Sequence, residues 1–216
     1  MANIFDVFTT ISAPIFALYT ALGAAACDVP DEVEAAPRLF EAPAPKGFYI
    51  EKVVTTGKGC PDPASVAVQL APDKTTLRLA YKQMSLKAPP GVQTTNCQAT
   101  LTLHIPAGWR VALASLKTRG YARLGKTAKA HQHSTAFFAG VGGGIHFDKA
   151  VNGPYDGNYY AIDVVPPAAV EWSACGGSAL FSVNNSLILN AGADPNPPAS
   201  INVVAQRVFS WQFKPC

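Results

Sequence analysis

Two histidines two residues apart, His131 and His133, are the side chains with the clearest potential for metal chemistry. Residues two apart on a β-strand point to the same face, so two imidazoles could share one ion. His146 follows a run of glycines and could supply a third ligand. The pattern predicts either a zinc or copper site or a solvent-facing row of a strand without metal. The second interpretation is favoured, so no cofactor is expected.

Oxygen ligands are concentrated in a second stretch, where Asp148, Asp156 and Asp163 lie among turn-forming residues. Carboxylates are hard ligands that suit Ca²⁺. Aspartate is also common in turns simply because its side chain caps them. The stretch therefore predicts a calcium site or ordinary turns.

Positive charge is distributed unevenly along the chain. No acidic residue occurs between Lys74 and Phe147, and this interval holds ten of the seventeen lysines and arginines. Such a segment predicts a basic patch with an anionic partner, or a solvated positive surface. Acidic polysaccharide or a cell-wall surface is the partner favoured for a secreted chain, and nucleic acid is not expected. The predicted anion-binding residues are Arg78, Lys82, Lys117, Arg119, Arg123, Lys126 and Lys129.

Motifs for covalent catalysis are not found in the sequence. There is no Gly-x-Ser-x-Gly nucleophile motif, and the glycines at 140–144 lack the Gly-Lys-Ser/Thr ending of a phosphate loop. We therefore expect a non-catalytic module that binds anionic or polysaccharide surfaces outside the cell. The alternatives are a metal-dependent enzyme that uses His131 and His133, and a self-assembling surface or fibre protein.

The first 26 residues have the character of a secretory leader. The segment from Val7 to Ala26 is mostly apolar and ends in small residues before Cys27. Polar residues and a proline interrupt it, so a transmembrane anchor is not expected. The five cysteines include no Cys-x-x-Cys pair, which favours disulfides over a zinc site. Secretion is the predicted localisation.

Alternation of apolar and polar residues recurs in short segments. Leu101, Leu103 and Ile105 alternate with polar residues, and Pro106-Ala107-Gly108 then predicts a turn into a return strand, forming a hairpin. Further strands are predicted at 48–56, 65–70, 75–84, 109–118, 130–139, 158–165, 170–174, 179–190 and 201–213.

Composition and pattern together predict an all-β fold. The 17 glycines and 18 prolines suit many short strands better than long helices. We expect an antiparallel two-sheet β-sandwich, similar to a jelly roll, with a barrel as the alternative. The expected organisation is a signal peptide at 1–26, an acidic, proline-rich extended segment at 27–47 and one β-sandwich domain at 48–216.

Several short motifs resemble one family of secreted proteins. They are Gly57-Lys58-Gly59-Cys60-Pro61, Thr75-Thr76-Leu77, Asn96-Cys97, Pro106-Ala107-Gly108-Trp109, Arg119-Gly120-Tyr121, Trp172-Ser173-Ala174-Cys175-Gly176 and Trp211 to Cys216. Over residues 48–216 the chain resembles the mostly fungal, partly bacterial proteins grouped as domain of unknown function 4360. The resemblance implies pairing of Cys60 with Cys97 and of Cys175 with Cys216. It implies no catalytic residue and leaves Cys27 unpaired.

One modification site is predicted from the sequence. Asn184-Asn185-Ser186 has the pattern of an N-glycosylation sequon, with Asn184 as the acceptor. Secretion would bring the chain into the compartment where such a site is used.

Overall fold

The computed structural model describes residues 42–88, 91–142, 144–192 and 199–216, with side chains at 88 and 203–208 left out. All of these residues belong to one compact unit, Ala35–Cys216. The expected leader, Cys27 and most of the segment 27–47 lie outside the described residues. Within the described ranges, no helix is long and apolar enough to cross a membrane.

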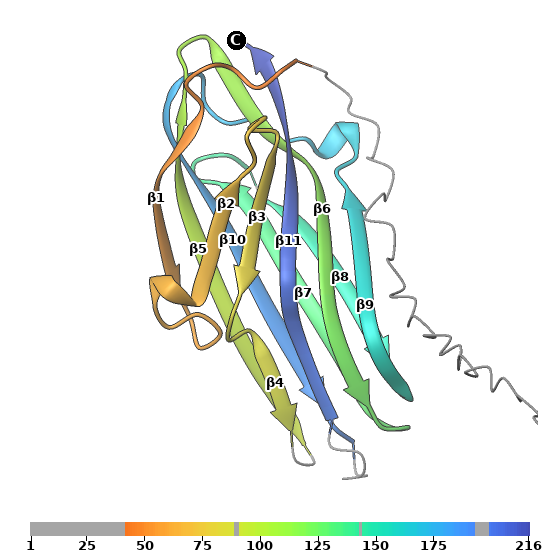
Figure 1. Ribbon diagram of the computed structural model, residues 1–216. Coiled ribbons are helices and arrows are strands. Elements are labelled where there is room, and N and C mark those ends of the chain that lie inside the picture. Colours follow the sequence, from red (N-terminus) through yellow and green to blue (C-terminus); the bar gives the residue numbers. More distant parts are fainter. Residues whose placement is uncertain (1–41, 89–90, 143, 193–198) are drawn as a thin grey trace, which may run out of the picture. The chain divides into compact units, whose positions relative to one another are not determined.

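Five antiparallel strands form one layer, called sheet A, in the order β1-β5-β10-β7-β8 (Figure 1). Their bounds are β1 (Tyr49–Thr56), β5 (Val92–Ile105), β10 (Gly177–Asn190), β7 (Lys129–Phe138) and β8 (Ile145–Asn152). The long strands β5 and β10 pair along their whole length in the middle of the sheet. The edges of sheet A are β1 and β8.

Six antiparallel strands form the second layer, called sheet B, whose main path is β2-β3-β11-β6-β9. Their bounds are β2 (Val66–Leu70), β3 (Thr76–Tyr81), β11 (Ala199–Pro215), β6 (Trp109–Leu124) and β9 (Tyr155–Val164), with β4 (Ser85–Ala88) pairing β11. Two short 3₁₀ helices, η1 (Pro63–Ser65) and η2 (Pro167–Ala169), lie in connections. The described fold is the predicted antiparallel two-sheet β-sandwich.

The hairpin predicted between β5 and β6 is wrong. The turn itself is present, because Trp109 N donates to Pro106 O at 3.2 Å and Gly108 has a φ of +79°. However, β5 pairs with β1 and β10 in sheet A, whereas β6 pairs with β11 and β9 in sheet B. A tight turn fixes the local reversal of the chain but not the sheet that the next strand joins.

Two other expectations about local structure are also wrong. The segment containing Asp148, expected to be rich in turns, is strand β8. The segment 170–174, expected to be a strand, makes only an isolated bridge between Trp172 and Ala112. It is held instead by Ser173, whose hydroxyl accepts a hydrogen bond from Val111 N at 3.1 Å.

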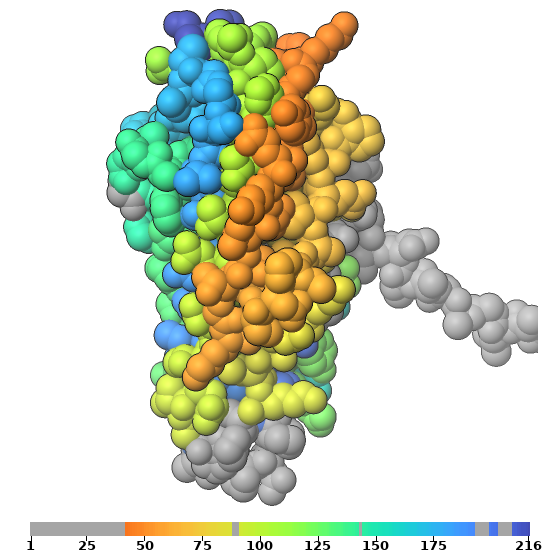
Figure 2. All heavy atoms as spheres, turned by 90° about the vertical axis from the view of Figure 1, so that its left-hand side faces the viewer, coloured from red at the N-terminus to blue at the C-terminus, as the bar shows by residue number. Residues whose placement is uncertain are grey.

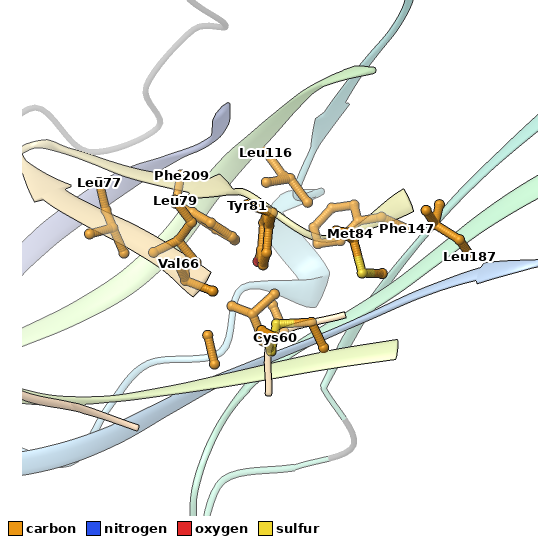
Figure 3. Packing of buried hydrophobic residues seen from close by; sticks show 14 of the residues in the cluster. Cys60, Val66, Leu77, Leu79, Tyr81, Met84, Leu116, Phe147, Leu187 and Phe209 are labelled. Carbon is orange, nitrogen blue, oxygen red and sulfur yellow. A yellow bond between two sulfur atoms is a disulfide. The ribbon is translucent and has the colours of Figure 1, made fainter. Parts of the chain in front are cut away.

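The inward rows of both sheets meet in one hydrophobic core. Figure 3 shows side chains of both layers directed into the space between them, among them Leu79 and Phe209 of sheet B and Leu187 of sheet A. Aromatic rings fill much of the interior: Phe181 contacts Trp211 with ring centroids 4.8 Å apart and nearly perpendicular planes. Edge-to-face pairs of this kind add to the stabilisation from burial.

Two disulfides have the pairing that the family resemblance implied. Cys60 is bonded to Cys97 and is fully buried, with a Cα–Cα distance of 5.3 Å. Cys175 is bonded to Cys216, with a Cα–Cα distance of 6.0 Å, and both residues are exposed. The second disulfide joins the segment before β10 of sheet A to the end of β11 of sheet B, so it links the two layers.

Close backbone approach explains one glycine of the motif before Cys60. Gly57 has a φ of +120°, and a Cβ there would lie 2.5 Å from Asn96 O. Asn96 immediately precedes Cys97, so a side chain at 57 would separate the two segments that the disulfide joins. The motif is therefore accounted for by packing.

Candidate functional site

The outer face of sheet B carries a group of permanent positive charges. Alternation along β6 turns Leu116, Thr118 and Ala122 inward, and it turns Lys117, Arg119, Tyr121 and Arg123 outward. Five of the outward cations of sheet B form what we call the cationic face: Arg78 of β3, Lys87 of β4, and Lys117, Arg119 and Arg123 of β6. Arg78 and Lys117 pair with the same position of β11, Val208, so the cations extend across adjacent strands.

An aromatic ring lies beside these cations. Arg119 pairs across strands with Tyr160, and its guanidinium carbon lies 5.7 Å from the ring centroid, within cation–π range. Tyr160 is 49% exposed and begins an outward row on β9 with Ile162 and Val164. The cationic face is therefore bordered by an accessible apolar edge.

Asp156 of β9 is the one carboxylate on the outer face among the described strand residues of sheet B. Its Oδ2 lies 3.6 Å from Arg123 Nε, and its Oδ1 accepts a hydrogen bond from the Tyr121 hydroxyl. This hydrogen bond raises the pKa of Tyr121 above its ordinary value, and desolvation and the nearby negative charge act in the same direction. Asp156 thus neutralises one end of the cationic face.

Three of the predicted anion-binding residues do not belong to the cationic face. Lys82 lies in the connection after β3 and Lys126 in the turn after β6, and both are exposed. Lys129 is the first residue of β7 in sheet A. In their place the structure adds Lys87, which sequence analysis did not select because β4 is too short to show a clear alternation.

The predicted histidine site lies on the outer face of sheet A. His131 and His133 project outward from β7, and Asp148 is directly opposite His133 on β8. Asp148 Oδ1 lies 2.8 Å from His133 Nδ1 and 3.3 Å from His131 Nε2. The hydrogen bond from His133 holds the pKa of Asp148 below its ordinary value, and the neighbouring imidazoles contribute in the same direction.

His146 adjoins this group without touching Asp148 directly. Its ring centroid is 5.8 Å from that of His133. Thr135 Oγ1 lies between the two rings, 3.2 Å from His146 Nδ1 and 3.4 Å from His133 Nε2. We call His131, His133, His146 and Asp148 the histidine cluster. The sequence pattern groups the histidines but does not add Asp148 to them, because β8 was not predicted as a strand.

The three carboxylates predicted to bind calcium are not brought together. Asp148 is held by the histidine cluster on sheet A, and Asp156 is held by Arg123 and Tyr121 on sheet B. Asp163 points inward from β9 and lines a small pocket together with Asp148 and Lys149 at the edge between the two sheets, whereas Asp156 does not line this pocket. Among the residues that the structure describes, no group of three or more His, Cys, Asp or Glu side chains is arranged so that it could hold a metal ion.

The rest of the outer face of sheet A is largely uncharged and combines polar side chains with exposed apolar ones such as Leu180 and Ile188. Figure 2 shows this layer from its β1 edge, with β1 in orange, β5 in yellow-green and β10 in blue. Thr100 of β5 and Ser182 of β10 share a hydrogen bond of 2.9 Å. Asn184, the predicted glycosylation site, is exposed in the middle of this face. A glycan at Asn184 would not disturb the core, and its presence stays a prediction.

A histidine–carboxylate pair at the other side of sheet A was not foreseen from the sequence. His104 Nδ1 lies 3.3 Å from Glu51 Oε1, and the His104 ring stacks on Tyr49 with centroids 4.7 Å apart. Ser178 donates to both carboxylate oxygens, at 2.9 and 3.0 Å. The polar atoms of this pair are therefore mutually satisfied, which suits a structural role.

Fold and surface together define a disulfide-stapled β-sandwich with a cationic outer face. The chain belongs to the family described as Domain of unknown function (DUF4360), which matches residues 46–216. It is 31% identical over 154 residues to a protein of Arthroderma benhamiae (strain ATCC MYA-4681 / CBS 112371) named "Uncharacterized secreted protein". That match covers 69% of this chain and 62% of the relative. The secreted relative and the two disulfides identify the protein as extracellular.

Solved structures with some similarity include two carbohydrate-binding modules. TmCBM61 in complex with β-1,4-galactotriose has a TM-score of 0.31 and 10% identity, covering 77% of this chain and 90% of that module. The module CBM6cm-2 from Cellvibrio mixtus lichenase 5A, in complex with cellotriose, has a TM-score of 0.22 and 14% identity, covering 73% and 96%. TM-scores this low support no inference about the present protein.

Proposed function

We propose that this extracellular protein is a non-catalytic module whose cationic face binds acidic polysaccharide, such as that of a cell wall or matrix. The observation that carries the proposal is the grouping of Arg78, Lys87, Lys117, Arg119 and Arg123 on one outer face with a single opposing carboxylate. An anionic partner gains from every one of these charges. Extracellular location favours a polysaccharide over nucleic acid.

The chemistry of the cationic face suits a linear polymer that carries repeated carboxylates or sulfates. Alternate residues of β6 are spaced by roughly 6.7 Å, so Lys117 and Arg119 can engage successive anionic groups along a chain. The guanidinium groups of Arg119 and Arg123 can each grip a carboxylate or sulfate through two parallel hydrogen bonds. Tyr160 offers an exposed ring against which the apolar face of a sugar can pack.

A binding assay with soluble polysaccharides tests the proposal. Immobilised protein is exposed to polygalacturonate, a sulfated glycan and neutral dextran at about 0.02 M and about 0.15 M NaCl. The variant Lys117→Gln/Arg119→Gln/Arg123→Gln is compared with Lys46→Gln/Lys52→Gln/Lys58→Gln, which removes the same charge from exposed positions outside the cationic face. We expect the two acidic polymers to bind, more weakly at the higher salt concentration, and dextran not to bind.

The two variants decide whether the cationic face is the site. Exposed ion pairs contribute about 0.2–1 kcal/mol each, so losing three of them should weaken binding of the acidic polymers about tenfold. In the control variant, the loss of binding free energy should be less than about half of that in the variant of the cationic face. Equal losses in the two variants, or binding of dextran as strong as that of polygalacturonate, would refute the proposal.

A further inference from the structure

The outward side chains of β9 change from polar to apolar along the strand. Asp156 and Asn158 come first, and Tyr160, Ile162 and Val164 follow. These last three side chains are 49%, 45% and 48% exposed. The other exposed large apolar side chains among the described residues are spread over β1, β5 and β10 of sheet A. We call Tyr160, Ile162 and Val164 the apolar row.

The register between β6 and β9 places cations directly beside the apolar row. Arg119 is opposite Tyr160, and Lys117 is opposite the next residue of the row. Towards the start of β9, Asp156 forms an ion pair with Arg123. One end of β9 thus presents a carboxylate to the cations of β6, and the other end presents apolar side chains. Among the described strands, β9 is paired only with β6, so its other side is a sheet edge (Figure 1).

A ligand that covers both strands must carry anionic and apolar groups close together. Adjacent strands lie about 4.8 Å apart, and alternate residues of one strand lie about 6.7 Å apart. An anionic group on Arg119 therefore lies about 5–8 Å from groups that contact Tyr160 or Ile162. Substituents on the same sugar or on neighbouring sugars of a linear polymer are separated on this scale. A polysaccharide that carries both free and esterified carboxylates fits the arrangement.

The position of the apolar row favours such a polymer over a lipid surface. The row lies on the flat face of a strand and has cations as its neighbours. Insertion of Ile162 into lipid hydrocarbon would also draw Arg119 out of water, and removing a charge from water is costly. A polymer that lies along β9 can contact the row while the guanidinium group stays hydrated or binds a carboxylate.

We propose that the apolar row makes this module selective for acidic polysaccharide that is partly esterified, with ester methyl groups packed on Ile162 and Val164. The inference rests on the function proposed for the cationic face. Arg119 holds a free carboxylate through charge-assisted hydrogen bonds, while the aliphatic side chains cover a neighbouring ester. Each methyl group that leaves water in this way strengthens binding by about threefold to fourfold.

Polygalacturonate samples of equal length and different esterification test the inference. They are unesterified, partly methyl-esterified and fully methyl-esterified. The full chain is compared with Ile162→Thr/Val164→Thr, which keeps β-branched residues on β9 but adds hydroxyl groups. The matched control is Val54→Thr/Leu180→Thr, because these side chains are 47% and 46% exposed on the outer face of sheet A. Thermal melting shows that each variant is folded.

The expected result is a loss that depends on the ester groups. The variant of the apolar row should bind the partly esterified polymer about fivefold more weakly than the parent protein does, and the unesterified polymer within about twofold. The control variant should match the parent with both polymers. The fully esterified polymer should bind the parent weakly, because it offers no carboxylate to Arg119. Methyl NMR signals of Ile162 and Val164 should shift more with the partly esterified polymer than with the unesterified one.

The outcomes separate this inference from the function on which it rests. If the variant of the apolar row lost affinity equally for both polymers, or for neither, selectivity for esters would be overturned and the proposed function would stand. If the parent protein did not bind the unesterified polymer, the proposed function itself would be refuted. Vesicles of equal parts phosphatidylglycerol and phosphatidylcholine, and sedimentation velocity, test other partners. Vesicle binding or a dimer that is lost in this variant would assign the row to a lipid surface or to a second copy, and would likewise overturn the inference.

Discussion

The outer faces of the two sheets are built by the same alternation of strands and carry different kinds of charge. On sheet B the charges are mainly those of arginines and lysines, with Asp156 as the carboxylate beside them. On sheet A, imidazoles lie beside Asp148 and Glu51, and Lys52 and Lys129 are also exposed on this layer. Cations thus predominate on the outer face of sheet B, whereas imidazoles and carboxylates lie in pairs on the outer face of sheet A.

The difference also extends to how the side chains are held. On sheet A, Asp148 accepts a hydrogen bond from His133 of the adjacent strand β7, and Glu51 of β1 accepts from Ser178 of β10, two strands away. On sheet B, Arg119 has the Tyr160 ring as its neighbour, and Arg123 lies beside a carboxylate that is 59% exposed. These arginine side chains therefore remain accessible to a ligand, because water contacts much of their surface.

The largest expected effect is on stability, and it comes from the packing beneath the cationic face rather than from the charges on it. A Cβ at Gly120 would lie 2.3 Å from the Tyr159 ring and 2.4 Å from Asn202 O, and Tyr159 is buried. Gly120→Ala should therefore lower the free energy of unfolding by about 1–3 kcal/mol, measured by urea denaturation. Polysaccharide binding should weaken as well, because Arg119 and Tyr121 flank the strained position.

Gly157→Ala on the paired strand β9 is the matched control. A Cβ at Gly157 would meet no heavy atom within 4 Å. Its unfolding free energy should stay within about 0.5 kcal/mol of the parent protein. If the two glycine variants were equally stable, sheet B would tolerate a side chain at position 120, and the predicted clash with Tyr159 and Asn202 would be refuted.

Features that depend on the local residue pattern could be predicted from the sequence, whereas features that depend on which strands lie side by side could not. Alternation located most strands, including β5 and β10, because burial of one row follows directly from a period of two. It missed β8 because Lys149 occupies an inward position there. That position is tolerated only because β8 is an edge strand next to the open side of the sandwich, a fact that depends on the partner strands.

The candidate sites show the same limit. His131 and His133 were predicted to share a face because they lie on one strand. Asp148 could not be assigned to them, since the contact depends on the register between β7 and β8. The same holds for Asp156, whose contact with Arg123 depends on the pairing of β6 with β9. Both disulfides came from the family resemblance, since spacing alone left several pairings open.

A second prediction asks whether Asp156 limits the cationic face. Asp156→Asn removes the carboxylate beside Arg123, so affinity for acidic polysaccharide should rise about two- to fivefold at low salt. The pKa of Tyr121 should fall towards its ordinary value, because its hydroxyl no longer donates to a carboxylate. Ultraviolet titration of the phenol measures that shift. Asp62→Asn, in an exposed connection after β1, makes the same charge change and should alter neither quantity.

The smallest expected effect concerns the hydrogen bond within the histidine cluster. The NMR titration of the Asp148 carboxyl should have a pKa below 3.8, and His133→Ala should move it back towards that value. His104→Ala should leave it unchanged. Because the folded-state pKa is lowered, the hydrogen bond stabilises the fold above the unfolded pKa of about 3.9 and is lost as pH falls through the folded value. The stability difference between the parent protein and Asp148→Asn should therefore be present at about pH 5 and shrink below about pH 4. If the difference in unfolding free energy instead grew as the pH was lowered, its source would be a group other than the ionised Asp148.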